Sequence, residues 1–440
     1  MAELAARAGK RVALVERNEK VCTEASGAHH GWFHFGSLYS IFPNNQFMRT
    51  MVGGIDDLLD YYRGFPGLNV AIDEHGRLKL GNSAGAWIRD EPIEYIVAAR
   101  NDPDFDLRRF TSMRDYLRKV AFTLGWDLTI KQFISRHQRF HKFDWRQGPA
   151  SMHIPKAGWL DYSREVIHKP KDFGCVIDPD THFKVIGFDR PMNARTIAKD
   201  LLASFVAQGG TLMRSCAFTG YERRGSLVAI STQGSTLEAE NLVIAAGRWL
   251  NDVSGIRTSV VASPLLVAYP RVCEINWARL TPFTDRTINH LKHYANGQPY
   301  SLIGGGYFAA PDDQAAVEAA KRNLLRTAEH VFPQLRKCSV KEIYVSYKTE
   351  IVAKLGERNY QYFIRQHDRN VYALVPGKFS LAFSLAVNAF KQIYGEEPSR
   401  TPPRRPDTNI DALVYVPLHE QLVQKHLHSV GDRRHAVTGT

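Results

Sequence analysis

The N-terminal sequence MAELAARAGKRVALVERNE has the pattern of a helix, a tight turn and a strand. Residues 1–8 are rich in Ala, Leu and Glu, which are strong helix formers. Gly9 suits a helix C-terminus, and Lys10 and Arg11 add positive charge there. The apolar run RVALVE follows at once, which is typical of a buried parallel strand. The segment therefore predicts the second half of a β-α-β unit.

In β-α-β units that bind dinucleotides, a glycine-rich loop follows the first strand, and an acid ends the second strand and binds the ribose hydroxyls. Glu16 stands where that acid is expected. The glycine loop is absent, because at the usual spacing its last glycine would precede Met1. We therefore expect the natural reading frame to begin upstream, with Met1 an internal start or a truncation. Without the loop, we expect the dinucleotide to bind poorly.

The composition is that of a globular protein with two or three cores: 440 residues, 44% hydrophobic and 23% charged. No apolar stretch approaches the roughly 18 residues of a membrane span. Charged residues interrupt the apolar N-terminal run, so we expect no secretory signal peptide. Five scattered cysteines form no C-x-x-C pair, so the sequence indicates neither a disulfide framework nor a zinc ribbon. We therefore expect a cytoplasmic location. The basic residues that give the net charge of +12 are spread out, with no long basic block, which favours general solvation of the surface over an anionic substrate, and an anionic substrate over a nucleic-acid partner.

The pattern of elements along the chain predicts two domains, each built from separated segments. An amphipathic helix at RTIAKDLLASFVAQGG leads through short strands to the buried strand LVIAAG. We expect RVALVE and LVIAAG to share one sheet. The expected cofactor domain comprises residues 1–69, 191–262 and 371–396, the substrate domain comprises 70–190 and 263–370, and a mobile Pro/Arg-rich polar tail comprises 397–440.

Two further segments have features that would help to bind the same dinucleotide as Glu16. In LVIAAGRWLNDV, small residues after the strand let the backbone approach a phosphate or ribose closely. In VYALVPGKFSLAFSLAVNAF, Gly377 breaks the strand and allows a turn. The helix that follows directs its free N–H groups and its positive dipole end at that turn, which favours an electron-rich group such as a reduced flavin.

The order and spacing of these segments resemble the flavoprotein family that includes D-amino-acid oxidase, glycerol-3-phosphate dehydrogenase and L-2-hydroxyglutarate oxidase. TEASGAHHGWFHFGSLYS is similar to the stretch after that family's second strand, where a Ser/Thr-Gly pair precedes a His-x-Gly turn and a Tyr. GKFSLAFSLAVNAF resembles the helix start of the glycerol-phosphate branch. In this sequence the first motif matches Ser26, Gly27, His34, Gly36 and Tyr39.

The resemblance implies an α/β fold, with a discontinuous Rossmann-like FAD-binding domain that lacks its first strand and glycine loop, and an α+β antiparallel-sheet substrate domain. It implies a FAD-dependent oxidoreductase, an oxidase or a dehydrogenase. Such an enzyme takes a hydride from a C–H bond beside an OH or NH group of a small anionic substrate. The FAD contacts that it implies are Glu16, Arg17, Ser26, Gly27, Ala245, Ala246, Gly247, Gly377, Lys378 and Phe379.

Two residues are candidates for the catalytic site. Where the family has an arginine that holds a substrate carboxylate or phosphate, YVSYKTE places Lys348. A lysine is a point charge, so it binds an anion without the two-pronged contact of arginine. His34 is the candidate for proton transfer because the unperturbed pKa of histidine lies near neutrality. A packing or turn role for His34 is the other interpretation.

Several alternatives stay open. His29 and His30 lie close to His34 in sequence, but no Cys/His partner motif is nearby, so we expect no metal site. The chain could also be a degenerate family member that keeps the fold without catalysis, as a binding or scaffold protein, or a basic protein associated with nucleic acid. Three tyrosines either line the substrate pocket or pack elsewhere: Tyr39, Tyr344 and Tyr347.

Overall fold

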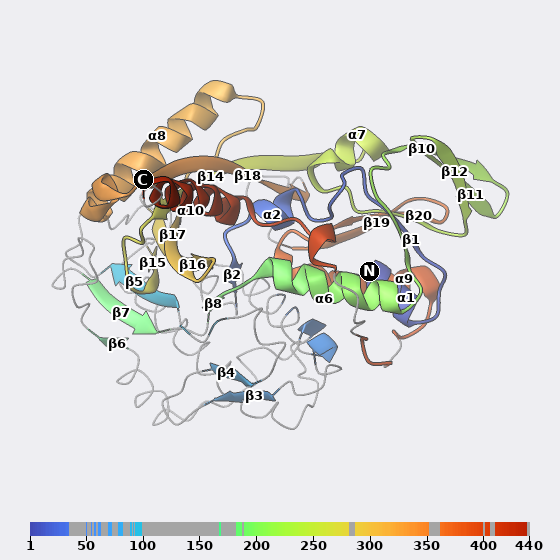
Figure 1. The fold of residues 1–440 in the computed structure, drawn as a ribbon. Helices are drawn as coiled ribbons and strands as arrows, with labels where there is room; N and C mark the ends of the chain where they lie inside the picture. The colour runs from blue at the N-terminus through green and yellow to red at the C-terminus, as the bar shows by residue number, and fades with distance from the viewer. Residues whose placement is uncertain are drawn as a thin grey trace, which may run out of the picture.

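In the computed structural model, a mixed α/β fold combines an eight-stranded sheet with a group of helices and smaller sheets (Figure 1). Gly36, Tyr39 and Cys175 lie outside the described residues. The structure describes residues 1–34, 50, 54, 57–58, 60–62, 69–72, 78–81, 89, 91, 93–98, 167–168, 182–186, 189–280, 287–351, 361–398, 401–404 and 410–437.

The N-terminal segment forms the predicted helix, glycine turn and strand. Helix α1 spans Ala2–Arg7, Gly9 has a φ of +79°, and strand β1 spans Ala13–Val15. β1 pairs in parallel with β9 (Thr211–Met213), which follows helix α6 (Ala194–Ala207). The predicted parallel pairing is confirmed, whereas the strand is only partly buried: its first residue is exposed, and it has a neighbour on one edge among the described strands. The upstream start of the reading frame stays a prediction.

Strand β13 (Leu242–Ile244) belongs to a different sheet from β1. It pairs in parallel with β20 (Val371–Val375), whose other edge pairs with β19 (Phe363–Asp368). The prediction that RVALVE and LVIAAG share one sheet is therefore wrong, since no described strand connects the two. Helix packing connects these two sheets instead, because α1 contacts both α6 and α9 (Ala382–Tyr394).

Two short elements follow β13, the 3-10 turn η5 (Gly247–Trp249) and helix α7 (Leu250–Ser254). A three-stranded antiparallel sheet packs its middle strand against the same core as β13. Its strands are β10 (Phe218–Arg224), β11 (Leu227–Thr232) and β12 (Ser235–Ala239).

The large sheet takes strands from both parts of the predicted substrate domain, although the domain boundaries themselves stay a prediction. Neighbouring strands are antiparallel except for the pair β15–β5. In spatial order the strands are β18 (Val340–Ile351), β14 (Thr258–Tyr269), β17 (Gln298–Gly305), β16 (Ile288–Ala295), β15 (Asn276–Leu280), β5 (Ile93–Ala98), β7 (His182–Ile186) and β6 (Ile167–His168).

Alternate side chains of the large sheet face two different helices. Leu266 of β14 packs in the cluster of α8 (Gln314–Val331), and its neighbour Leu265 packs in the cluster of α10 (Leu418–Val437). Because successive side chains of a strand point to opposite faces, α8 and α10 cover opposite faces of the sheet. None of the helices in the described part of the chain combines the length and apolar character that a membrane span needs.

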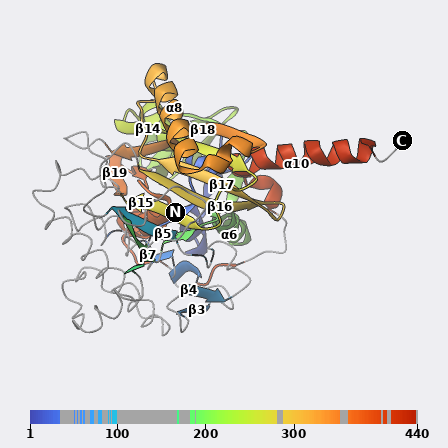
Figure 2. The same cartoon turned by 90° about the vertical axis from the view of Figure 1, so that its left-hand side faces the viewer.

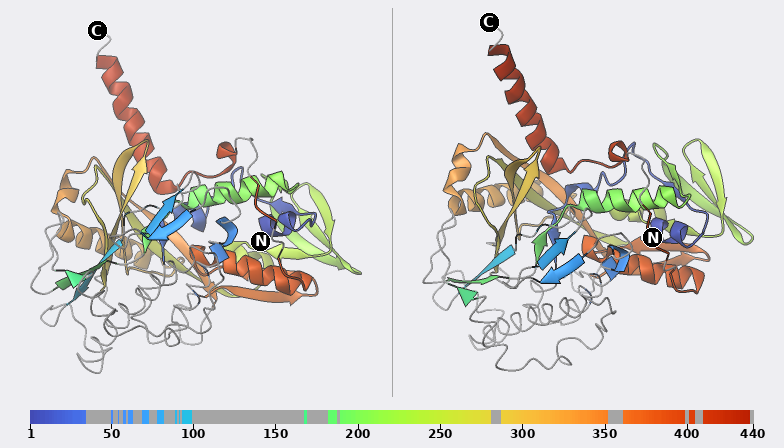
Figure 3. Two further views of the ribbon diagram at one scale, coloured as in Figure 1. Left: turned by 90° about the horizontal axis from the view of Figure 1, so that it is seen from below. Right: turned by 60° about the horizontal axis from the view of Figure 1, so that its bottom comes forward.

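The C-terminal segment is not a mobile polar tail. Ile410 and Val414 are buried against α6, and Val423 of α10 is 0% exposed against the large sheet. The far end of α10 extends away from the rest of the described chain (Figures 2 and 3). The prediction for 397–440 is therefore wrong from residue 410 onward, because a polar composition masked a stripe of apolar side chains in α10.

The remaining short elements position the candidate site. Helix α2 (Ala25–Ala28) and strand β2 (Trp32–Phe33) flank a histidine-rich loop, and β2 pairs with β8 (Arg190–Pro191). A separate hairpin is formed by β3 (Asn69–Ile72) and β4 (Leu78–Gly81).

Candidate active site

The loop from α2 to β2 lies between the large sheet and the start of α9. The ring of His29 lies 5.1 Å from that of Phe379, at the start of α9. On the other side, His30 approaches β17 so closely that a Cβ added to Gly304 would lie 3.0 Å from its ring. The loop therefore brings residues from three distant parts of the sequence together.

Asp189 is the polar centre of this region, although no sequence motif indicates it. Its side chain is 0% exposed. One carboxylate oxygen, Oδ2, accepts hydrogen bonds from Trp32 Nε1 at 2.8 Å, from Tyr95 OH at 2.5 Å and from His34 Nδ1 at 3.1 Å. Because Asp189 directly precedes β8, the pairing of β8 with β2 places it beside Trp32 and His34.

The environment of His34 favours a neutral imidazole at pH 7. Its pKa is lowered from 6.5 to about 4: burial is the largest cause, the contact with Asp189 opposes it, and the charges of Lys378 and Lys348 add to it. A proton on Nδ1 makes the hydrogen bond to Asp189, so Nε2 is the nitrogen with the lone pair. A neutral histidine held in one tautomer can accept a proton.

Lys348 lies in the same region, on β18. Its Nζ donates a hydrogen bond to Ser263 Oγ at 3.0 Å and lies 4.8 Å from the ring centroid of Phe308. Phe308 is 42% exposed, which is unusual for a large apolar side chain. The positive charge of Lys348 also lowers the pKa of His29, after the larger effect of burial. The structure thus brings Lys348 and the histidine loop together.

The predicted pocket residues on β18 do not share one face. Tyr344 and Lys348 are four positions apart and lie on one face, whereas Tyr347 lies on the other, below the guanidinium of Arg248 at 4.3 Å. The hydroxyl of Tyr344 is buried without a hydrogen-bond partner, and burial raises the pKa of Tyr344 well above 10.0. Tyr347 therefore belongs with the cofactor side described next.

Glu16 lies at the end of β1, as predicted. Its Oε1 accepts hydrogen bonds from the backbone N and the side-chain Nδ2 of Asn18, both at 2.9 Å. Within the described residues, Oε2 has no hydrogen-bond donor. The carboxylate is thus held in place with one oxygen available to a ligand.

A cluster of charges connects the end of β1 with the end of β13. Arg17 and Arg248 both contact Glu24, at 2.8 Å and 2.9 Å. Their guanidinium carbons lie 4.4 Å and 4.6 Å from the ring of Trp249. Since Arg17 follows β1 while Arg248 and Trp249 follow β13, the two predicted cofactor segments lie side by side despite their separate sheets.

The glycines predicted to contact the cofactor fall into two kinds. Gly247 has a φ of +55°, and an added Cβ would meet nothing within 4 Å, so its backbone is open to a ligand. A Cβ at Gly377 would lie 2.4 Å from the carbonyl oxygen of Gln361, and one at Gly27 would lie 2.5 Å from that of Cys22. At these two positions the packing of the protein itself requires glycine.

The other predicted contacts are distributed around these groups. Lys378 precedes the 3-10 turn η7 (Phe379–Leu381), which leads into α9 with no side-chain cap at its start. Ala245 is exposed at the end of β13, and Ser26 lines a neighbouring cavity. The described residues contain no group of three or more His, Cys, Asp or Glu side chains placed to hold a metal.

A family comparison covers the middle of the chain. Residues 188–375 match the family model DAO, described as FAD dependent oxidoreductase. This part of the chain is therefore similar to the FAD-dependent oxidoreductases. The match confirms the predicted family, with FAD as the cofactor of that family, and it includes Asp189, β13 and Lys348. A sequence search against curated proteins finds no match.

Solved structures of similar fold cover nearly the whole chain. L-proline dehydrogenase from P. horikoshii has 10% sequence identity and a TM-score of 0.58, with 90% of each chain covered. Glycine oxidase from Geobacillus kaustophilus has 14% identity and a TM-score of 0.57, covering 92% of this chain and 95% of its own. L-alpha-glycerophosphate oxidase from Mycoplasma pneumoniae, with FAD bound, has 12% identity and a TM-score of 0.56, covering 94% and 95%. At these identities the likeness concerns the fold, and it confirms the predicted fold class.

Proposed function

We propose that this chain oxidises a C–H bond beside an OH or NH group of a small anionic substrate, with FAD as the hydride acceptor. The observation that carries the proposal is the environment of His34. The buried carboxylate of Asp189 holds its Nδ1, and the charges of Lys348 and Lys378 act on the same imidazole. A proton acceptor with two cations near it suits a negatively charged substrate that gives up a proton when it is oxidised.

The proposed roles follow from these contacts. His34 accepts the O–H or N–H proton at Nε2, and Asp189 fixes the tautomer and stabilises the positive charge that forms on the ring. Lys348 binds the anionic group of the substrate, and Phe308 beside it shields the site from water. Bound FAD supplies the electron chemistry.

The residues at the ends of β1 and β13 fit FAD. The open oxygen of Glu16 suits a ribose hydroxyl, and the open backbone at Gly247 allows close approach of a ribose or phosphate. The guanidinium groups of Arg17 and Arg248 provide positive charge next to that backbone. Lys378 and Phe379, at the start of α9, suit the electron-rich edge of the flavin.

The anionic substrate class is supported by chemistry that the similar proteins share. Proline, glycine and a glycerophosphate, which appear in their names, each combine an anionic group with a C–H bond beside nitrogen or oxygen. Lys348 provides the matching cation here. A lysine without the fork of an arginine accepts either a carboxylate or a phosphate.

The test is a spectrum followed by a reduction assay. With FAD kept in excess, because the missing glycine loop is expected to weaken its binding, the full chain is expected to bind flavin and to show its absorption band near roughly 450 nm. Small 2-hydroxy acids, amino acids and glycerol phosphate are then added without oxygen, and the correct class is expected to bleach the band. His34→Gln is expected to keep the band and lose the bleaching. A chain that binds no flavin would favour the degenerate binding protein instead.

A further inference from the structure

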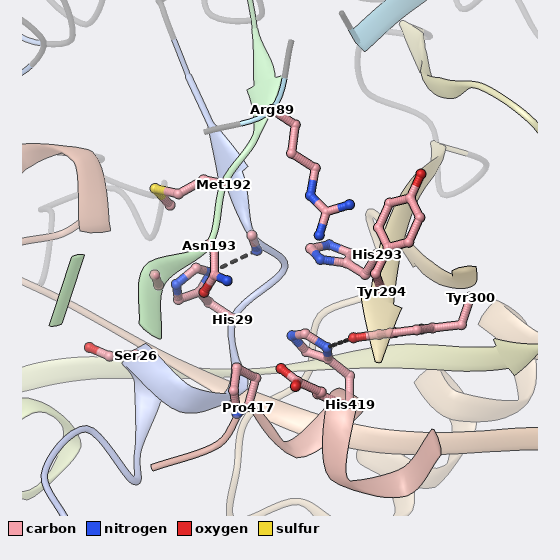
Figure 4. A pocket seen from close by; sticks show the side chains of 13 residues that line it. Ser26, His29, Arg89, Met192, Asn193, His293, Tyr294, Tyr300, Pro417 and His419 are labelled. Atoms are coloured by element: carbon pink, nitrogen blue, oxygen red, sulfur yellow. Dashed lines mark hydrogen bonds between the residues drawn. The ribbon is translucent and has the colours of Figure 1, made fainter. Parts of the chain in front are cut away.

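A polar cavity lies beside the histidine loop, where the starts of α6 and α10 meet β16 and β17 (Figure 4). Its empty space, with the open solvent at its mouth included, is about 380 Å³. Ser26 and His29 form the wall toward the candidate active site. The remaining walls are Gly31, Arg89, Met192, Asn193, Ala194, His293, Tyr294, Tyr300, Pro417, His419 and Glu420.

Arg89 is the cationic group of this cavity. Its guanidinium carbon lies 4.2 Å from the ring centroid of Tyr294, and Figure 4 shows the side chain directed toward His293. Within the described residues the guanidinium has no hydrogen-bond acceptor and no carboxylate at ion-pair distance. Burial lowers the pKa of Arg89. A half-buried guanidinium without an anion is costly, so the site favours one.

The acids near Arg89 do not neutralise it. Glu91 is engaged by Lys292, whose Nζ lies 2.8 Å from the carboxylate. Glu420 accepts a hydrogen bond from Gln424 Nε2 at 3.0 Å and forms no ion pair among the described residues. Burial raises the pKa of Glu420, against the opposing charges of Arg195 and Arg89. Among the described residues, the cavity therefore keeps an arginine with no ion-pair partner.

The histidines on the other walls are polar but uncharged, and the one N–H of His293 donates to His30 O at 3.3 Å. His293 and His419 are 6% and 5% exposed, and their rings lie 5.0 Å apart. Burial lowers the pKa of both, so the two imidazoles are neutral at pH 7. His419 Nδ1 pairs with the hydroxyl of Tyr300 at 2.6 Å, which fixes the ring (Figure 4). On the opposite wall, His29 Nε2 is buried and has no hydrogen-bond partner among the described residues.

We propose that this cavity binds a small oxyanion, a carboxylate or a phosphate group, on the guanidinium of Arg89. The planar fork of arginine matches two oxygens of either group. Neutral His29 adds an N–H donor, since its Nδ1 accepts from Gly31 N and its proton is therefore on Nε2, and the start of α6 adds the positive end of a helix dipole. The site is separate from Lys348, which lies with Ser263 and Phe308 outside the cavity walls.

The first test is calorimetric titration of the full chain, at constant ionic strength in chloride, with inorganic phosphate and separately with acetate. Saturable binding of either anion, one per chain, is expected, and the anion that binds identifies the group. Arg89→Met is expected to weaken binding by about tenfold or more, because a charge-assisted contact is lost. Arg365→Met removes an exposed arginine on β19 and is the matched control, expected to bind as the unchanged chain does.

A second variant has the opposite expected sign. Glu420→Gln removes the negative charge that faces Arg89, so it is expected to tighten oxyanion binding by about threefold or more. This variant decides the matter if thermal unfolding shows that Arg89→Met is not folded. The proposal is overturned if neither anion binds, if a folded Arg89→Met binds as before, or if Glu420→Gln weakens binding. The last outcome would indicate a ligand with its own cation.

Discussion

Asp189 Oδ2 and His34 Nδ1 lie 3.1 Å apart although 155 positions separate them in the sequence. The short pairing of β2 with β8 makes this contact, because it places Trp32–Phe33 opposite Arg190–Pro191. A buried carboxylate that accepts hydrogen bonds from Trp32, His34 and Tyr95 holds the histidine in one orientation. The relationship makes Asp189 the residue that positions the proposed base.

Asp189→Asn tests this positioning. An amide has the same shape but can present its NH₂ to His34, which favours the wrong tautomer, so kcat is expected to fall by roughly 10²-fold or more. Flavin content is expected to stay unchanged because Asp189 accepts hydrogen bonds from Trp32, Tyr95 and His34, which are not proposed FAD contacts. The measurements are kcat and the flavin absorbance per chain.

The double variant separates positioning from a loss of structure. If Asp189 acts through His34, adding Asp189→Asn to His34→Gln costs little further activity. Asp252→Asn, on the surface of α7, is the control and should be neutral. Additive losses from the two substitutions would show that Asp189 supports the fold independently of His34.

Lys348→Met tests the proposed anion contact. The loss of the ammonium is expected to raise KM for the anionic substrate by about tenfold or more, while flavin content changes little. Lys348→Arg keeps the charge and is expected to recover part of the affinity. Lys341→Met is the control. Lys341 lies on the same strand as Lys348 and forms an exposed ion pair with Glu329 of α8. Equal loss of flavin and substrate binding in Lys348→Met would mean that the residue supports the fold.

Elements whose signals are local could be predicted from the sequence. α1, α6, α8 and α9 follow helical spacing of apolar side chains, and Gly9 and Gly209 end helices at φ values of +79° and +82°. These patterns span a few neighbouring helical turns. The elements therefore form through local interactions, without contacts to distant parts of the sequence.

The site depended on contacts that no local pattern encodes. Asp189 and Arg89 stand in no motif, and the pairing of distant strands and the packing of α10 give them their environments. Apolar spacing from Leu418 through Leu422 to Val423 was the available signal for α10, and the polar composition around it obscured that signal. His34 and Lys348 could be selected only through a family resemblance, and their proposed roles stay predictions.

Acid is expected to destabilise the protein between pH 6.5 and about pH 4. His29, His34 and His290 have pKa values lowered by burial from 6.5 to about 4, and His419 to about 3. In this window the unfolded chain binds more protons than the folded chain, so the free energy of unfolding falls as pH falls. At pH 5 each fully buried histidine contributes at most about 2 kcal/mol of this loss.

Urea unfolding at pH 7, 6 and 5 measures the effect. His290→Gln removes one such histidine, far from the proposed site and bonded to Ile275 O and Ser301 Oγ, so its pH dependence is expected to be shallower. His428→Gln, exposed on α10, should reproduce the slope of the unchanged chain. Stability that does not vary across this range would contradict the burial of neutral histidines.

Gly377→Ala is expected to destabilise the fold rather than only weaken the cofactor. The added Cβ would lie 2.4 Å from the carbonyl oxygen of Gln361, and φ is +64°. The strain and the collision together are expected to cost about 2–4 kcal/mol. Gly395→Ala is the matched control, since φ is +69° there but the Cβ meets open space. It should cost about 1 kcal/mol, and equal losses in the two variants would remove the collision from the explanation.

The packing of α10 supports both the large sheet and the oxyanion cavity. Val423 is 0% exposed against the large sheet, and His419 and Glu420 lie one turn earlier as walls of the cavity. Val423→Ala is therefore expected to lower the free energy of unfolding by about 1–3 kcal/mol and to weaken phosphate or acetate binding, as the first turn of α10 loses its anchor. Lys425→Ala, exposed on the same helix, is the control and should change neither quantity. Urea unfolding and calorimetric titration of the two variants measure both effects. Unchanged stability in Val423→Ala would mean that the C-terminal helix is not part of the folded core.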